Sequence, residues 1–247
     1  MKLRYFSDLH LEFMKLKQIE KLHIPLGLDD ICILAGDIGN PYEPNYDIFM
    51  NFISKNFKKT FIIAGNHEYY NKMKTMKETN DFLKEYFIKF NNITFLNNNY
   101  EHYENHCFIG TTLWSKITDP TNKINDVYCI PNFDHIKYNE IHKTSVEFLE
   151  NAIQNNENCI VITHHVPSKK LIDSKYKTPI IEPYNQWFYC DMDELIETKQ
   201  DKIKCWIYGH THTPSNVIIN KIPFLCNPIG YPNENINSNF ETSIKFE

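Results

Sequence analysis

The chain alternates short apolar segments with longer amphipathic ones, and this alternation constrains the fold more than any other feature. Six segments rich in Ile, Val, Phe and Cys are expected to form strands, at 2–6, 30–36, 59–65, 107–113, 158–164 and 204–210. Several are apolar throughout, as strands covered on both faces are. Segments with helical spacing of apolar residues lie between them, near 44–57, 72–90, 140–155 and 191–199. This order predicts a layered α/β domain.

The remaining segments complete the predicted organisation. The last part of the chain contains three further expected strands, at 215–220, 222–228 and 242–247. Segments 115–138 and 166–190 are rich in Pro, Asn, Asp and Tyr and are expected to be surface loops. No repeat period or flexible linker divides the sequence, and 247 residues suffice for one large core. We therefore expect a single domain over 1–247.

Composition and charge narrow the class of function. Hydrophobic residues make up 42% of the chain and charged residues 23%, as in folded enzymes and binding domains. The net charge of −5 argues against a basic groove that holds long nucleic acid. The one arginine, Arg4, lies inside a predicted strand. Because arginine forks are the usual bidentate partners of phosphate, a phosphate site in this chain would need metal ions or lysines.

The cysteines and the N-terminus predict an intracellular protein. The seven cysteines are an odd number, contain no CxxC pair and lie mostly in strand-like segments, so we expect reduced thiols in the core. The N-terminal segment carries charge through its apolar stretch, and no segment reaches the roughly 18 apolar residues of a membrane span. We therefore expect a cytoplasmic protein without a signal peptide and without a membrane partner.

Metal-ligand residues follow one predicted strand after another. These residues are Asp8, His10, Asp37, Asn66, His67, His164, His210 and His212. In open α/β sheets ligands bind outside the carboxyl ends of the strands, so these side chains are expected to converge. Each short pattern by itself is more often a turn or a helix cap. Five such patterns in order, each at the end of an apolar strand, indicate a metal centre instead.

These patterns resemble those of the calcineurin-like metallophosphoesterase superfamily. The matching segments are DLH at 8–10, GD at 36–37, GNHE at 65–68, THH at 163–165 and GHTH at 209–212. More narrowly, SDLHLEF, GTTLWS and NPIGYP resemble a group of compact bacterial and viral members. The resemblance implies a four-layer α-β-β-α sandwich in which two mixed sheets are flanked by helices.

The resemblance also implies a site for two divalent ions. The first ion would be held by Asp8, His10, Asp37 and His212. The second ion would be held by Asp37, Asn66, His164 and His210, so that Asp37 bridges the two. Mixed nitrogen and oxygen ligands suit Mn, Fe or Zn, and the sequence does not choose among them.

The implied reaction is hydrolysis of a phosphoester or phosphoanhydride bond. A hydroxide that bridges the two ions would attack phosphorus, and His67 would protonate the leaving oxygen as the general acid. Asp37 is thus assigned to catalysis as well as to both ions. His165 and Tyr69 are predicted substrate contacts. The expected partner is a small phosphorylated molecule, with nucleotides among the candidates, rather than a long nucleic acid.

Within this class a phosphodiesterase or a nucleotide pyrophosphohydrolase is the favoured activity. A phosphomonoesterase of the protein phosphatase type is an alternative, but in that branch the Gly-Asp pattern continues into Asp-Arg-Gly, where this chain has GDIGNP. A second alternative is a non-catalytic scaffold with the same fold. Scaffolds of this kind lose ligands or the catalytic histidine, whereas every expected position is filled here.

Overall fold

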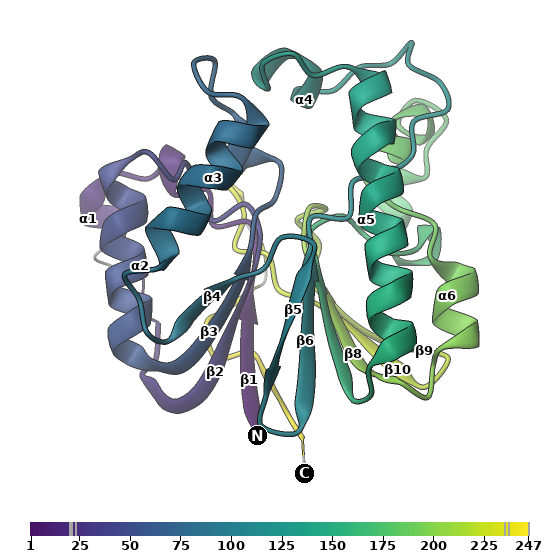
Figure 1. Cartoon of the computed structure of the whole chain (residues 1–247). Helices are drawn as coiled ribbons and strands as arrows, with labels where there is room; N and C mark the ends of the chain where they lie inside the picture. Colours follow the sequence, from purple (N-terminus) through teal and green to yellow (C-terminus); the bar gives the residue numbers. More distant parts are fainter. Residues whose placement is uncertain (20–21, 23, 235, 237, 247) are drawn as a thin grey trace.

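Two β-sheets face each other in a computed structural model that describes residues 1–19, 22, 24–234, 236 and 238–246 (Figure 1). The first sheet has the strand order β11-β1-β2-β3-β4 and the second the order β5-β6-β7-β8-β10-β9. The first consists of β1 (Lys2–Phe6), β2 (Gly27–Ala35), β3 (Phe57–Ile63), β4 (Ile93–Phe95) and β11 (Ser243–Lys245). The second consists of β5 (Asn99–Tyr103), β6 (His106–Thr111), β7 (Cys159–Thr163), β8 (Ile203–Tyr208), β9 (Ser215–Ile219) and β10 (Ile222–Cys226).

Both sheets are mixed. Strands β1 to β4 are parallel to one another, and so are β6, β7, β8 and β10. Antiparallel strands lie at the edges: β11 pairs with β1, β5 with β6, and β9 with β10. The parallel strands carry the apolar segments predicted from the sequence, because strands buried on both faces need apolar side chains on each face.

The inner faces of the two sheets form a common core. Leu3, Ile33 and Phe61 of the first sheet belong to the same buried cluster as Phe108 and Ile162 of the second. The rings of Phe61 and Phe108 stack with centroids 4.0 Å apart. Burial of such side chains is the main favourable term in folding, at about 25 cal/mol per Å² of apolar surface.

Helices cover the outer faces. Figure 1 shows α2 (Pro44–Asn56) and α3 (Met76–Phe87) against the first sheet, and α5 (His135–Asn155) and α6 (Asp193–Thr198) against the second. The short helices α1 (Leu16–Ile19) and α4 (Asp126–Cys129) lie in connections. The prediction of an α-β-β-α sandwich with two mixed sheets is therefore confirmed.

The structure adds elements that the sequence pattern did not reveal. Strand β5 was not predicted, since it is a mostly exposed edge strand whose polar side chains leave no apolar period. Helix α5 begins at residue 135 rather than near 140, because the Asp134 carboxylate accepts a hydrogen bond from the Lys137 amide and caps it. The predicted loops contain α4 and three 3₁₀ turns, at Lys169–Leu171, Ser174–Tyr176 and Glu182–Trp187.

The structure also shows the environment of the cysteines and of Arg4. All seven cysteines are free, and all but Cys129 are buried. Arg4 is buried on β1, where its Nε donates to Asp30 Oδ2 at 2.6 Å, so it is not available to a phosphate. Within the described part of the chain, no helix has the length and apolar character needed to cross a membrane.

Candidate active site

The predicted ligands lie in five loops that follow the carboxyl ends of β1, β2, β3, β7 and β8. Asp8, His10 and His164 are fully buried, and Asp37 and Asn66 are almost so. Burying two carboxylates and several imidazoles in one place costs free energy unless a positive charge lies among them. The five loops thus converge as the strand-end argument predicted.

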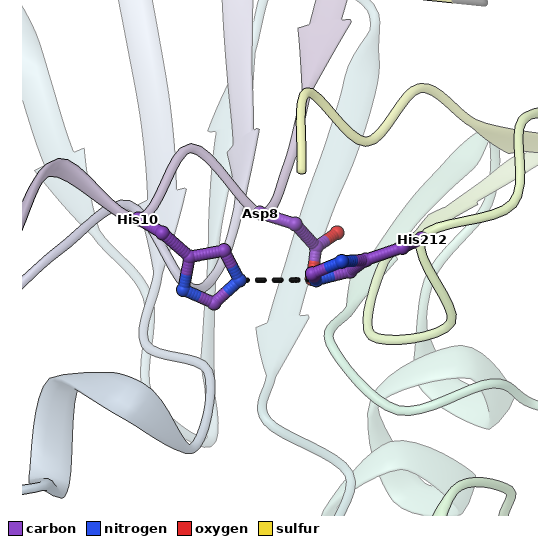
Figure 2. Close-up of side chains that lie close together, drawn as sticks. All are labelled: Asp8, His10 and His212. Carbon is purple, nitrogen blue, oxygen red and sulfur yellow. Dashed lines mark hydrogen bonds and ion pairs between the residues drawn. The ribbon is translucent and has the colours of Figure 1, made fainter. Parts of the chain in front are cut away.

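The first group of donor atoms comes from Asp8, His10 and His212 (Figure 2). The Nε2 atoms of His10 and His212 face each other at 3.0 Å. His212 Nε2 lies 3.5 Å from Asp8 Oδ1, and His10 Nε2 lies 3.9 Å from Asp37 Oδ2. These atoms are the donors expected for the first ion.

The second group comes from Asp37, His164 and His210, with Asn66 beside them. His164 Nε2 lies 3.3 Å from Asp37 Oδ2 and 3.0 Å from Asn66 Oδ1. His210 Nε2 is buried and has no hydrogen-bond partner among the described residues. A buried nitrogen lone pair without a partner fits a metal ligand, and the same carboxylate oxygen of Asp37 faces both groups.

Hydrogen bonds at Nδ1 fix the ring orientation of three of the histidines predicted as ligands. His164 Nδ1 donates to Ala35 O at 3.0 Å. His10 Nδ1 donates to Glu12 Oε1 at 3.2 Å, and His212 Nδ1 donates to Glu234 Oε2 at 2.6 Å. In the neutral ring this arrangement leaves a lone pair on each Nε2, directed into the site. Metal-ligating histidines commonly have such an oxygen partner behind them.

The buried carboxylates make the site strongly attractive to positive charge. Burial lowers the pKa of His164, but Asp37 and Asp8 outweigh it and raise that pKa to about 10. Burial likewise lowers the pKa of His212, and Asp8 and Glu234 raise it to about 9. Burial together with the neighbouring histidines lowers the pKa of His210, which therefore stays neutral. These residues fit two divalent cations in donor chemistry, in placement and in charge.

The backbone that carries the ligands is unusual. Asp8, His10, Asp37, His210 and His212 all have positive φ, between 45° and 74°. Non-glycine residues rarely adopt this region, and strain of this kind is typical of functional sites. Gly65 allows the close approach, because a Cβ there would lie 2.2 Å from Asp37 Oδ1.

Glu68 holds two of these loops together. Its Oε1 accepts hydrogen bonds from the amides of Ile38 and Gly39, and its Oε2 accepts from the amides of Asp37 and Gly65, at distances from 2.7 to 3.4 Å. The carboxylate is buried and lies outside both ligand groups. Glu68 therefore positions the loop that carries Asp37.

His67 lies beside the ligands and points into a cavity. Its amide donates to Asp37 Oδ1 at 2.8 Å, its ring Nδ1 donates to Glu12 Oε1 at 3.0 Å, and its Nε2 lies 3.3 Å from Tyr231 Oη. Burial lowers the pKa of His67, but Asp37 and Glu12 outweigh it and raise the pKa. A raised pKa is the direction of shift that a general acid requires.

The cavity has a volume of about 430 Å³, within the usual range for small-molecule sites. Asp37, Asn66, His67, His210 and His212 form one side of it. The remaining lining includes Tyr70, Ile124, Tyr184, Phe188, Tyr231 and Glu234. The ligand groups thus open onto a space that could hold a substrate.

Two predicted substrate contacts do not reach this cavity. His165 is fully buried, with Nδ1 3.2 Å from Thr112 O and Nε2 2.9 Å from Tyr138 Oη, and burial lowers its pKa to about 3. Tyr69 is 2% exposed in the core, and its hydroxyl donates to Asn80. Both residues pack behind the ligands, so their assignment to substrate binding is corrected.

Four other residues at the site were not predicted. Glu12 contacts His10 and His67, Glu234 contacts His212, and Tyr231 lies beside His67. Asp126 Oδ1 accepts a hydrogen bond from Asn66 Nδ2 at 2.8 Å. Glu12 and Tyr231 fall within SDLHLEF and NPIGYP, which drew attention only through the resemblance, and the other two carried no local signal.

Comparison with known proteins identifies related sequences and folds. An uncharacterized protein of Acanthamoeba polyphaga mimivirus is 33% identical to this chain, over 96% of this chain and 94% of its own length. The phosphopantetheinyl hydrolase of Mycobacterium tuberculosis has a similar fold, with a TM-score of 0.75, 16% identity, and coverage of 94% of this chain and 90% of its own.

A putative 5'-nucleotidase of Staphylococcus aureus, solved with α-ketoglutarate, is also similar in fold. Its TM-score is 0.51 at 15% identity, with coverage of 92% of this chain and 48% of the nucleotidase chain. At these identities the two solved structures support the fold alone.

The match to a protein family extends to the site itself. The family model described as calcineurin-like phosphoesterase matches residues 1–214. This range contains all of the predicted metal ligands and His67. The chain therefore belongs to the calcineurin-like phosphoesterase family and is a metal-dependent phosphoric ester hydrolase.

Proposed function

We propose that the chain hydrolyses a phosphodiester or phosphoanhydride bond of a small substrate at a site for two divalent ions. The observation that carries this proposal is the pair of donor groups that share Asp37, at the mouth of a cavity of about 430 Å³. The volume suits a small molecule rather than a long polymer.

The proposed ligands follow the two groups. Asp8, His10, His212 and Asp37 would hold one ion. Asp37, His164, His210 and Asn66 would hold the other. When bound, the ions supply Lewis acidity toward the phosphoryl oxygens and an activated water nucleophile. The donor set is compatible with Mn, Fe or Zn.

His67 is the proposed proton donor. The oxygen of a water molecule bonds to phosphorus and gives up one proton to solvent, and the bond between phosphorus and the leaving oxygen breaks. The leaving oxygen takes the proton held at His67 Nε2, and solvent returns a proton to His67 after the reaction. Glu12 orients the ring through Nδ1, and Asp37 holds the backbone amide of His67. The support for this role is that His67 lines the cavity and that Glu12 holds its Nδ1, which leaves Nε2 for the leaving oxygen.

Metal removal and reloading test this proposal. Protein stripped with a chelator and then supplied with Mn²⁺ is expected to hydrolyse bis(p-nitrophenyl) phosphate, because the ligand groups are complete. The stripped protein without added metal serves as the control. Release of p-nitrophenolate is measured at several metal concentrations, and p-nitrophenyl phosphate is assayed in parallel. The absence of metal-dependent turnover on a panel of phosphate monoesters and diesters would contradict the proposal.

A further inference from the structure

We infer that the cavity selects a phosphodiester in which a single phosphoryl group carries a neutral aromatic group, and that it disfavours nucleoside polyphosphates. This inference rests on the proposed function, because that function places the phosphoryl group at the two ligand groups. It narrows that function to the phosphodiester, and it names the chemistry of the part of the substrate that does not react.

The wall of the cavity is apolar and aromatic, and it begins directly beside the ligands. The ring of Phe188 lies 4.8 Å from that of His210, and the ring of Tyr70 stacks on His67 at 4.2 Å. The wall continues through Ile172, Ile181 and Tyr184. An aromatic group placed here would gain area burial and ring contacts, which are worth about 0.5–1.5 kcal/mol per aromatic pair beyond the area.

Hydrogen bonds hold this wall in place before any substrate arrives. The side-chain amide of Asn185 is buried and donates to Tyr176 O at 2.9 Å and to Glu182 Oε2 at 3.0 Å. The hydroxyl of Tyr176 donates to Thr211 O at 3.2 Å, and Thr211 lies between His210 and His212. The wall is thus fastened to a ligand loop, and a preformed wall costs less ordering entropy on binding.

Charge in the cavity argues against a second phosphate. The described residues that line it include neither lysine nor arginine, but they include the acids Asp37 and Glu234. Of the lysines in the neighbouring segment, Lys169 pairs with Glu182 and Lys170 pairs with Asp193, whereas Lys175 lies over the ring of Tyr176 at the cavity wall. A phosphate beyond the ligand groups would therefore lose its hydration without a cationic partner among the described residues that line the cavity.

A pair of matched diesters tests this inference. We expect the Mn²⁺-loaded protein to hydrolyse phenyl p-nitrophenyl phosphate with a kcat/KM at least about 10-fold above that for methyl p-nitrophenyl phosphate, because the phenyl group buries more apolar area. The variant Tyr184→Ala is expected to reduce this ratio at least about threefold. The matched control is Tyr128→Ala, because Tyr128 is 68% exposed and does not line the cavity, and this variant should keep the ratio.

Equilibrium binding tests the selectivity of the cavity independently of the hydrolysis reaction. The phenyl and methyl monoesters of methylphosphonic acid are titrated calorimetrically into the loaded protein, and the phenyl ester is expected to bind at least about 10-fold more tightly. If neither diester is hydrolysed but the phenyl ester binds more tightly, the proposed function fails and the cavity inference stands. Equal dissociation constants, or a higher kcat/KM for ATP than for the phenyl diester, overturn the inference.

Discussion

The variant His67→Ala is expected to lower kcat by ~10²–10⁴ for a diester with an alkyl leaving group, with both metal ions retained. An alkoxide is a poor leaving group unless it is protonated, and His67 lines the cavity with its Nδ1 held by Glu12, which leaves Nε2 to supply the proton. Both metal ions should remain bound because the substitution does not change Asp37 or the other proposed ligands. Steady-state kinetics and elemental analysis of the purified variant measure the two quantities.

The leaving group distinguishes proton donation from a structural role of His67. With p-nitrophenolate, which departs without protonation, the loss in His67→Ala should be much smaller than with an alkyl leaving group. The control variant is His102→Ala, because His102 is an exposed residue on the edge strand β5 and should not affect turnover. An equal loss for both leaving groups would contradict the assignment of His67 as the general acid.

The variant Asp37→Asn is expected to reduce bound metal from two ions per chain to one or fewer, and to lower kcat by at least about 10³-fold. The carboxylate Oδ2 lies 3.3 Å from His164 Nε2 and 3.9 Å from His10 Nε2, so it faces both groups. An amide has one acceptor oxygen and no charge, so it bridges two cations poorly.

A second buried aspartate serves as the control for this substitution. Asp30 pairs with Arg4 and Lys2 on the first sheet, and it is not part of either ligand group. The variant Asp30→Asn should therefore keep both ions and the turnover of the folded protein. If Asp37→Asn retained two ions and wild-type kcat, Asp37 would not be the bridging ligand.

Most strands, and the convergence of polar side chains at their carboxyl ends, could be predicted from the sequence because each of these signals is local. An apolar segment followed by Gly-Asp or Gly-Asn-His predicts a strand and also identifies the polar side chain at the end of that strand. The order of such segments predicted a layered α/β domain, and the four layers were implied by the resemblance to the metallophosphoesterases. The assignment of His10 and His212 to one ion came from the resemblance to the metallophosphoesterases, and the two Nε2 atoms lie 3.0 Å apart although the residues are 202 positions apart in sequence.

The supporting contacts could not be predicted, because they depend on tertiary placement. Asp126 reaches Asn66 across 60 positions from a segment expected to be a loop, and Glu234 reaches His212 across 22. His165 adjoins a ligand in sequence, yet packing turns its ring toward Tyr138 and away from the cavity. Tyr69 is another such case, since the helical turn at His67–Tyr69 directs it into the core.

Turnover measured against bound metal tests the central claim most directly. Stripped protein is titrated with Mn²⁺, and the rate of diester hydrolysis is recorded at each equivalent together with the metal retained after gel filtration. The two donor groups that share Asp37 predict negligible turnover without metal and a plateau at two ions per chain. A plateau at one ion, or full activity in the stripped protein, would contradict a dinuclear phosphoesterase.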